Sequence, residues 1–126
     1  MKKILVWASI FICSVSSGQG FQDEGTLVVF WNVENFFDWT DQGTGESDKE
    51  FSSMGSRHWT RKKFFAKCDV IAKTFLWMKD RYGRLPDVVG LAEVENGKVL
   101  KMLLESSLLR KYGYGTVHYD SRDRRG

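Results

Sequence analysis

An amide and a carboxylate each follow a short apolar run in this chain. Residues 27–31, Leu-Val-Val-Phe-Trp, lead into Asn32, and residues 88–92, Val-Val-Gly-Leu-Ala, lead into Glu93. Short runs rich in β-branched and aromatic residues are typical of buried strands in a parallel sheet. Because ligands bind beyond the carboxyl ends of strands in open α/β sheets, we expect Asn32 and Glu93 at one rim. There they can serve a hard cation and a phosphate.

These residue types fit a site for Mg²⁺ or Mn²⁺. Magnesium prefers oxygen ligands, keeps several waters, and is commonly held by one or two carboxylates plus substrate phosphate. Glu93 suits the anchoring carboxylate, while Asn32 can bind the ion or donate a hydrogen bond to a phosphate oxygen. Glu34 lies two residues after Asn32, on the same side of an extended chain, and is a third candidate ligand. A single Asn or Glu at a strand end is more often a cap, so the pairing carries the prediction.

The spacing of apolar residues predicts the elements that position this pair. Thr60 is a candidate N-cap for a helix of about 20 residues that ends at Gly83 and Pro86. Lys67 and the other lysines of this segment are expected mostly away from its apolar stripe. The stripe consists of Phe64, Cys68, Ile71, Phe75 and Met78.

The rest of the chain completes an alternating pattern of strands and helices. Asn96 is a candidate cap for a second helix, and residues 116–119 are expected to form a third strand. Residues 38–57, rich in glycine and serine, predict a long loop. The order strand, helix, strand, helix, strand predicts an α/β class. Three parallel strands leave open edges, so residues 19–126 are expected to be the truncated N-terminal part of a larger domain.

The amino terminus predicts export. Lys2 and Lys3 precede an apolar stretch at residues 4–15, and small residues at 16–18 suit cleavage before Gln19. Residues 1–18 are therefore expected to be a signal peptide, and the mature protein to be secreted or periplasmic. The stretch is shorter than the roughly 20 apolar residues of a membrane span. We expect no stable membrane insertion after processing, with an uncleaved anchor as the alternative.

Processing changes the charge and the cysteine content. Removal of Lys2 and Lys3 leaves 17 basic and 16 acidic residues, a net charge of +1. Residues 19–60 carry two basic and eight acidic residues, whereas residues 61–126 carry 15 basic and eight acidic ones. Such a division suits a divalent cation held beside a polyanion. Cys68 is the sole cysteine of residues 19–126, and its spacing indicates a core residue rather than a zinc ligand.

Two motifs of this chain resemble a known superfamily. They are FWNVENFFD at residues 30–38 and PDVVGLAEVEN at residues 86–96. They resemble the first two motifs of the endonuclease/exonuclease/phosphatase superfamily, which includes pancreatic-type deoxyribonuclease, abasic-site endonucleases, neutral sphingomyelinases and inositol-polyphosphate phosphatases. The likeness is greatest to its secreted or periplasmic bacterial members.

The resemblance implies a fold, a reaction and site residues. The fold is a four-layer α/β sandwich, of which this chain is the N-terminal portion. By position, Asn32 positions metal and phosphate, and Glu93 binds the catalytic magnesium, so both are catalytic candidates. Glu34 falls near the metal, and Arg125 is assigned a phosphate contact. The implied activity is hydrolysis of phosphodiester bonds by metal-assisted attack of water, and the implied substrate is nucleic acid. The enzyme is expected to be a monomer.

The departures from the family pattern leave alternatives open. The mid-chain histidine, the Asp-x-Asn motif and the C-terminal Ser-Asp-His are absent, so the 126-residue chain alone is expected to be inactive. A phosphatase or lipid phosphodiesterase of the same superfamily is one alternative, and a non-enzymatic binding module or gene remnant is another. Trp39 and Trp59 are the aromatic residues expected to be exposed, where they can stack on nucleic-acid bases.

Overall fold

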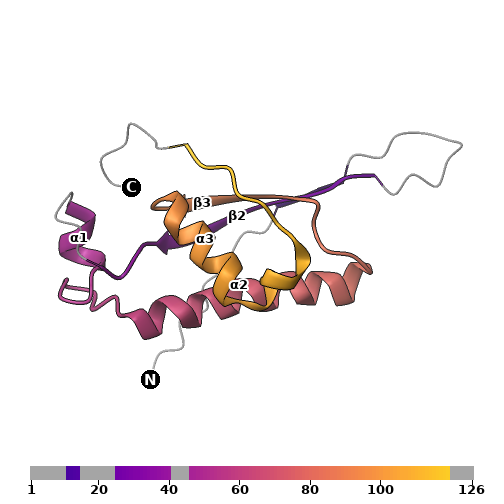
Figure 1. The fold of residues 1–126 in the computed structure, drawn as a ribbon. Helices are drawn as coiled ribbons and strands as arrows, with labels where there is room; N and C mark the ends of the chain where they lie inside the picture. Colours follow the sequence, from indigo (N-terminus) through magenta and orange to yellow (C-terminus); the bar gives the residue numbers. More distant parts are fainter. Residues whose placement is uncertain (1–10, 15–24, 41–45, 120–126) are drawn as a thin grey trace, which may run out of the picture.

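A small sheet with helices packed on one face forms the described part of the molecule (Figure 1). This computed structural model describes residues 11–14, 25–40 and 46–119. In chain order the elements are β1 (Phe11–Ser14), β2 (Leu27–Phe36), α1 (Glu46–Phe51), α2 (Arg61–Tyr82), β3 (Val88–Val94), α3 (Gly97–Ser106) and the 3₁₀ helix η1 (Leu108–Tyr112). None of the described helices is long and apolar enough to cross a membrane.

The sheet has the strand order β1-β2-β3. Strands β2 and β3 pair in parallel, from Val28 opposite Val88 to Asn32 opposite Ala92, and α2 lies in the connection between them. The predicted α/β class and the parallel pairing are confirmed. Strand β1 adds an antiparallel edge to β2 and lies within the segment assigned to a signal peptide. That assignment stays a prediction.

The core lies between one face of the sheet and the helices. Along β2 the side chains alternate, so that Val29, Trp31 and Val33 are buried while Val28 and Phe30 are exposed. The α2 side of the core is the predicted stripe, and all five of its residues are buried. Burial also raises the pKa of the Cys68 thiol to about 11. The sulfur therefore stays protonated at neutral pH, in agreement with a core role.

The predicted helix boundaries are confirmed by their caps. The Thr60 side chain accepts a hydrogen bond from the backbone N–H of Lys63, and Gly83 ends α2 in the left-handed conformation at φ 77°. Asn96 caps α3 by accepting from the N–H of Val99 at 3.0 Å. These caps fix where α2 and α3 begin, and therefore where β3 runs between them.

The predicted third strand does not form. Residues 116–119 pair with no strand, although the Tyr114 hydroxyl donates to the Pro86 carbonyl and His118 lies near Gly97. The segment therefore runs alongside β3 in the same direction. The segment is little buried there: the side chains of Val117 and Tyr119 are 80% and 87% exposed. The four-layer sandwich thus stays a prediction.

The predicted long loop is also wrong in part. Residues 46–51 of that stretch form the short helix α1. Several hydrogen bonds tie the following turn to its neighbours, among them Ser53 N–H to the Trp39 carbonyl at 3.0 Å and Trp59 N–H to the Ser52 carbonyl at 3.0 Å. The polar composition of the segment concealed these local contacts.

Candidate metal and phosphate site

The structure brings Asn32 and Glu93 into direct contact. The Asn32 side-chain amide, through Nδ2, donates to Glu93 Oε1 at 2.7 Å across 61 residues of sequence. Parallel pairing of β2 and β3 up to Asn32 opposite Ala92 accounts for the contact, because it brings the two strand ends to one edge. The prediction of a shared site requires the side chains of Asn32 and Glu93 to lie together at one rim, and they do.

The chain turns sharply just after Asn32. Asn32 Oδ1 accepts the backbone N–H of Glu34 at 2.8 Å, and Glu34 and Asn35 are left-handed at φ 54° and 52°. Asparagine favours such turns because its side chain bonds to the backbone two residues on. The same contact orients the amide, since its oxygen faces an N–H and its nitrogen therefore faces Glu93. Strand alternation continues to Glu34, since Asn32 and Glu34 are exposed and Val33 between them is buried, and the left-handed turn begins at Glu34. The role of Glu34 as a metal ligand stays a prediction.

Glu93 is an exposed carboxylate whose two oxygens are both held by donors. Its Oε2 accepts the Asn35 backbone N–H at 2.9 Å, and the residue itself is left-handed at φ 60°. The hydrogen bond from Asn32 lowers the pKa of Glu93 most, followed by the bond from Asn35, and the positive charge of Lys67 adds to both. Glu93 is therefore ionised at neutral pH.

This donor set fits a divalent cation bound through one carboxylate. Each Glu93 oxygen accepts one hydrogen bond in the contacts above, and each has a second lone pair. Among the residues that the structure describes, no three His, Cys, Asp or Glu side chains form a metal-binding group. The donors therefore suit Mg²⁺ or Mn²⁺, which keep waters and use substrate phosphate, rather than a closed protein cage.

Lys67 of α2 contacts the site, although the sequence predicted that this side chain lies away from the apolar stripe of the helix. Its ammonium donates to the backbone carbonyl of Glu34. Burial lowers the pKa of Lys67, and the nearby charges of Glu34 and Glu93 oppose that shift. A signal was present in the sequence: Lys67 lies three residues after Phe64 and four before Ile71, so it falls on the buried stripe.

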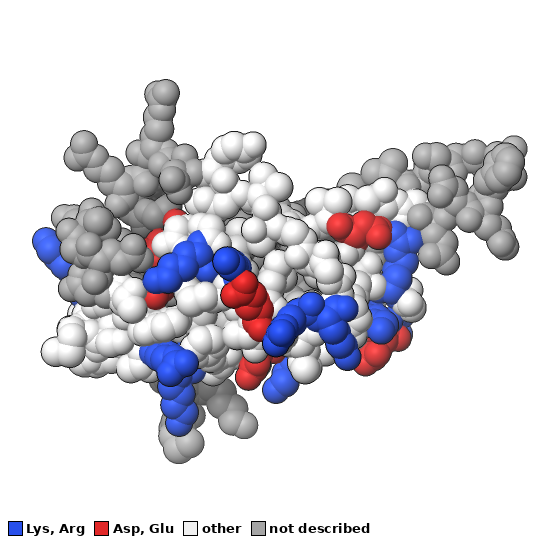
Figure 2. All heavy atoms as spheres, in the orientation of Figure 1, with Lys and Arg blue, Asp and Glu red and all other residues white. Residues whose placement is uncertain are grey.

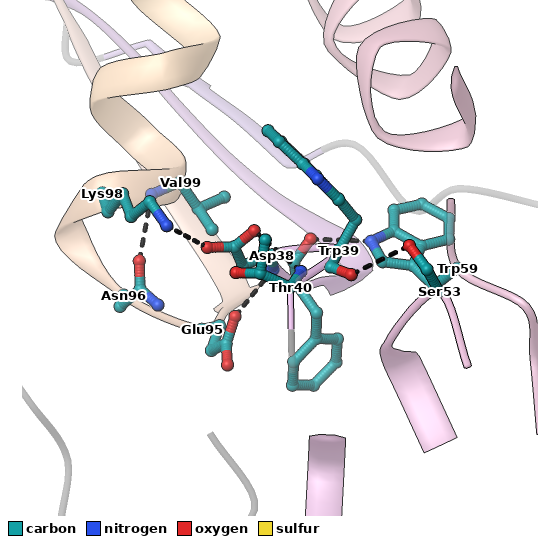
Figure 3. Close-up of polar contacts among 10 residues, drawn as sticks. Asp38, Trp39, Thr40, Ser53, Trp59, Glu95, Asn96, Lys98 and Val99 are labelled. Carbon is teal, nitrogen blue, oxygen red and sulfur yellow. Dashed lines mark hydrogen bonds and ion pairs between the residues drawn. The ribbon is translucent and has the colours of Figure 1, made fainter. Parts of the chain in front are cut away.

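A second polar cluster anchors the chain where it leaves the site (Figure 3). The buried Asp38 carboxylate contacts the Lys98 ammonium at 2.6 Å. The backbone N–H of Asp38 donates to the Glu95 carboxylate at 2.7 Å. Burial raises the pKa of Asp38, but hydrogen bonds from Lys98 and Thr40 outweigh burial and leave this pKa below the usual value. The cluster ties the segment after β2 to the start of α3.

The two tryptophans expected to be exposed are instead partly buried. The Trp39 ring lies 4.9 Å from that of Phe64, and Trp59 Nε1–H donates to the Phe37 carbonyl at 2.7 Å. Both therefore pack around the site rather than projecting from it. Trp77 of α2 is the more exposed tryptophan, at 55%.

The remaining predicted features lie on the surface or outside the described residues. Arg125 falls outside the described residues, so its phosphate contact stays a prediction. Figure 2 shows acidic and basic side chains intermixed over α2 and α3 on the face in view, with a mostly uncharged area above them. The division into acidic and basic parts of the sequence does not separate the charges on that face.

The sequence of this chain matches one known protein family. The sequence model of the Endonuclease/Exonuclease/phosphatase family matches residues 27–126, which include both strand ends and every contact of the site above. This chain belongs to that family. No curated protein and no solved structure matched it. Membership in the Endonuclease/Exonuclease/phosphatase family indicates a hydrolase of phosphoester bonds.

Replacing Asn32 tests the electrostatics of the site. In Asn32→Ala, we expect the pKa of Glu93 to rise towards its ordinary value, because the largest contribution that lowers it is removed. The ¹³C shift of the Glu93 side-chain carboxyl, followed against pH by NMR, measures this. Asn35→Gly keeps the backbone N–H donor, and glycine adopts the left-handed conformation readily, so it serves as the control. An unchanged Glu93 titration in Asn32→Ala would contradict the geometry.

Replacing Asp38 tests the second cluster. Because the folded-state pKa of Asp38 is depressed, its stabilising contribution is present above the unfolded-state pKa and is lost as pH falls through the folded-state value. At pH 7 we expect Asp38→Asn to lower the free energy of unfolding by about 2 kcal/mol. The difference from the parent should shrink towards pH 3. Urea denaturation at both pH values measures it, and an equal difference at the two would contradict the role of the ionised carboxylate.

Proposed function

We propose that this family member is a divalent-metal-dependent phosphodiesterase of the nuclease type, and that this chain supplies its metal-anchoring part. The observation that carries the proposal is the 2.7 Å contact between Asn32 and Glu93, two polar side chains at the ends of neighbouring parallel strands. An exposed, ionised carboxylate with oriented oxygens is the arrangement that a hard cation requires.

Each site residue has a distinct part in this proposal. Glu93 would hold Mg²⁺ or Mn²⁺, and Asn32 orients Glu93 while its second Nδ2 hydrogen is available to a phosphate oxygen. Glu34 is proposed to contribute negative charge beside the ion. When bound, such an ion polarises a phosphoryl oxygen and makes water more nucleophilic. Asn32 and Glu93 hold their geometry before substrate arrives, which is how preorganised groups stabilise developing charge.

Nucleic acid is the proposed substrate. The support for a polyanion over a small phosphomonoester comes from the sequence, which has 15 basic and eight acidic residues between positions 61 and 126. On the face in Figure 2 the charges of α2 and α3 are intermixed. Within this proposal the reaction takes place outside the cytoplasm, in keeping with the predicted signal peptide, and the protein acts as a monomer. Arg125 is proposed to contact a phosphate of the substrate.

Metal binding tests the proposal against a non-enzymatic binding module. In Glu93→Gln, we expect the dissociation constant for Mn²⁺ to rise at least about tenfold, because the anchoring charge is lost. Isothermal titration calorimetry measures it. The control is Glu105→Gln, the same change in α3 at an exposed residue paired only loosely with Lys101 at 3.8 Å. Equal Mn²⁺ affinity in the parent and in Glu93→Gln would contradict the proposal that Glu93 binds the metal.

Ligand competition tests the class of substrate. With Mg²⁺ present, we expect the chain to bind a fluorescent single-stranded DNA oligonucleotide, with affinity falling steeply as salt increases. Fluorescence anisotropy measures binding, and inositol phosphate or phosphatidylcholine vesicles serve as competitors. Hydrolysis of the DNA should stay at the level of Glu93→Gln, because the sequence lacks the family's acid/base motifs. Tighter binding of either competitor than of DNA would favour the phosphatase or lipid phosphodiesterase alternative.

A further inference from the structure

Lys67 extends from α2 to the carboxyl end of β2, where it contacts the backbone of Glu34. It projects from the buried side of α2, and its ammonium lies 5.9 Å from the Phe36 ring and 5.5 Å from the Trp59 ring. A cation between aromatic faces is attracted to their electron-rich surfaces. These contacts restrict the long side chain to one direction, towards the carbonyl of Glu34.

The carbonyl that Lys67 contacts belongs to the same peptide group that holds Glu93. The Glu34 C=O accepts from Lys67, and the N–H across that peptide bond, from Asn35, donates to Glu93 Oε2 at 2.9 Å. A trans peptide is planar, so its C=O and N–H point in opposite directions. An ammonium, one peptide group and a carboxylate therefore form a continuous chain of hydrogen bonds, in which each bond polarises the next.

The backbone at this peptide needs external support. Glu34 and Asn35 are left-handed at φ 54° and 52°, a conformation that is unfavourable for glutamate and that asparagine tolerates better. Asn32 supports the turn from one side by accepting the Glu34 N–H. Lys67 supports it from the other side, at the Glu34 carbonyl, and so fixes the direction of the Asn35 N–H.

We propose that Lys67 is a positioning residue, which orients the Glu93 carboxylate for a divalent cation through the peptide group between Glu34 and Asn35. The role rests on the proposed metal-binding function. Lys67 acts on Glu93 through its charge and through this peptide, so the second lone pairs of the carboxylate stay available. Orienting partners of this kind are common around metal ligands, and their loss usually weakens metal binding.

The opposite role makes the opposite prediction. If Lys67 served only as a positive charge competing with the ion, its removal would strengthen cation binding, because like charges repel. A lysine that positions Glu93 gives weaker binding when it is removed. The sign of the change in metal affinity therefore separates the two roles.

Substitutions on one face of α2 provide a matched experiment. In Lys67→Met, we expect the Mn²⁺ dissociation constant to rise about tenfold, and Lys67→Arg, which keeps a cationic donor, to recover most of that loss. The control is Lys63→Met, since Lys63 also donates to a backbone carbonyl, that of Arg57 at 3.1 Å, one turn earlier. Its Mn²⁺ affinity should stay within about twofold of the parent. Tighter Mn²⁺ binding by Lys67→Met would overturn the positioning role.

A second measurement needs no metal. In Lys67→Met, hydrogen exchange of the Asn35 amide, followed by NMR, should be about fivefold faster than in the parent, and in Lys63→Met it should be unchanged. Failure of the parent to bind Mn²⁺ would contradict the proposed function, and the positioning role with it. Unchanged Asn35 exchange in Lys67→Met, with intact Mn²⁺ binding by the parent, would contradict the positioning role alone.

Discussion

The hydrogen bond between Asn32 and Glu93 joins the carboxyl ends of two parallel strands, and the arrangement of the site depends on it. Two residues 61 positions apart can meet in this way only if the intervening chain returns β3 beside β2 in the same direction. Helix α2 performs this crossover while packing its buried stripe against the sheet. The fold and the site therefore depend on the same connection.

The two strands pair again beyond an irregularity that follows Asn32. Asn32 lies opposite Ala92, a separation of 60, whereas Phe36 lies opposite Val94, a separation of 58. The first strand thus contains two more residues than the second between these points. The left-handed turn after Asn32 accommodates them, and it is this turn that presents the Asn35 N–H to Glu93. A local irregularity in the strand is part of the site rather than a defect in it.

Much of the fold was predictable because it follows from short-range rules. A continuous apolar run rich in β-branched and aromatic residues located β2, helical spacing located α2, and Thr60 and Asn96 capped their helices as their residue types predicted. The predicted strand at 116–119 failed for a reason that local pattern does not contain. A strand needs a partner and a buried face, and the extended segment beside β3 has neither enough burial nor a ladder of hydrogen bonds.

The sequence by itself determined the α/β class and the family resemblance, and it predicted Asn32 and Glu93 at one rim of the sheet, because these depend on residue types and periodicities that are readable along the chain. The direct hydrogen bond between the two side chains was decided by the tertiary structure. Only the tertiary structure decided that Lys67 lies beneath the site and that Glu34 contributes its backbone carbonyl there. It also decided that Asp38 pairs with Lys98. These contacts depend on the turn between Asn32 and Phe36 and on side chains from separate elements. The direction of a backbone N–H is set by such packing rather than by the identity of one residue.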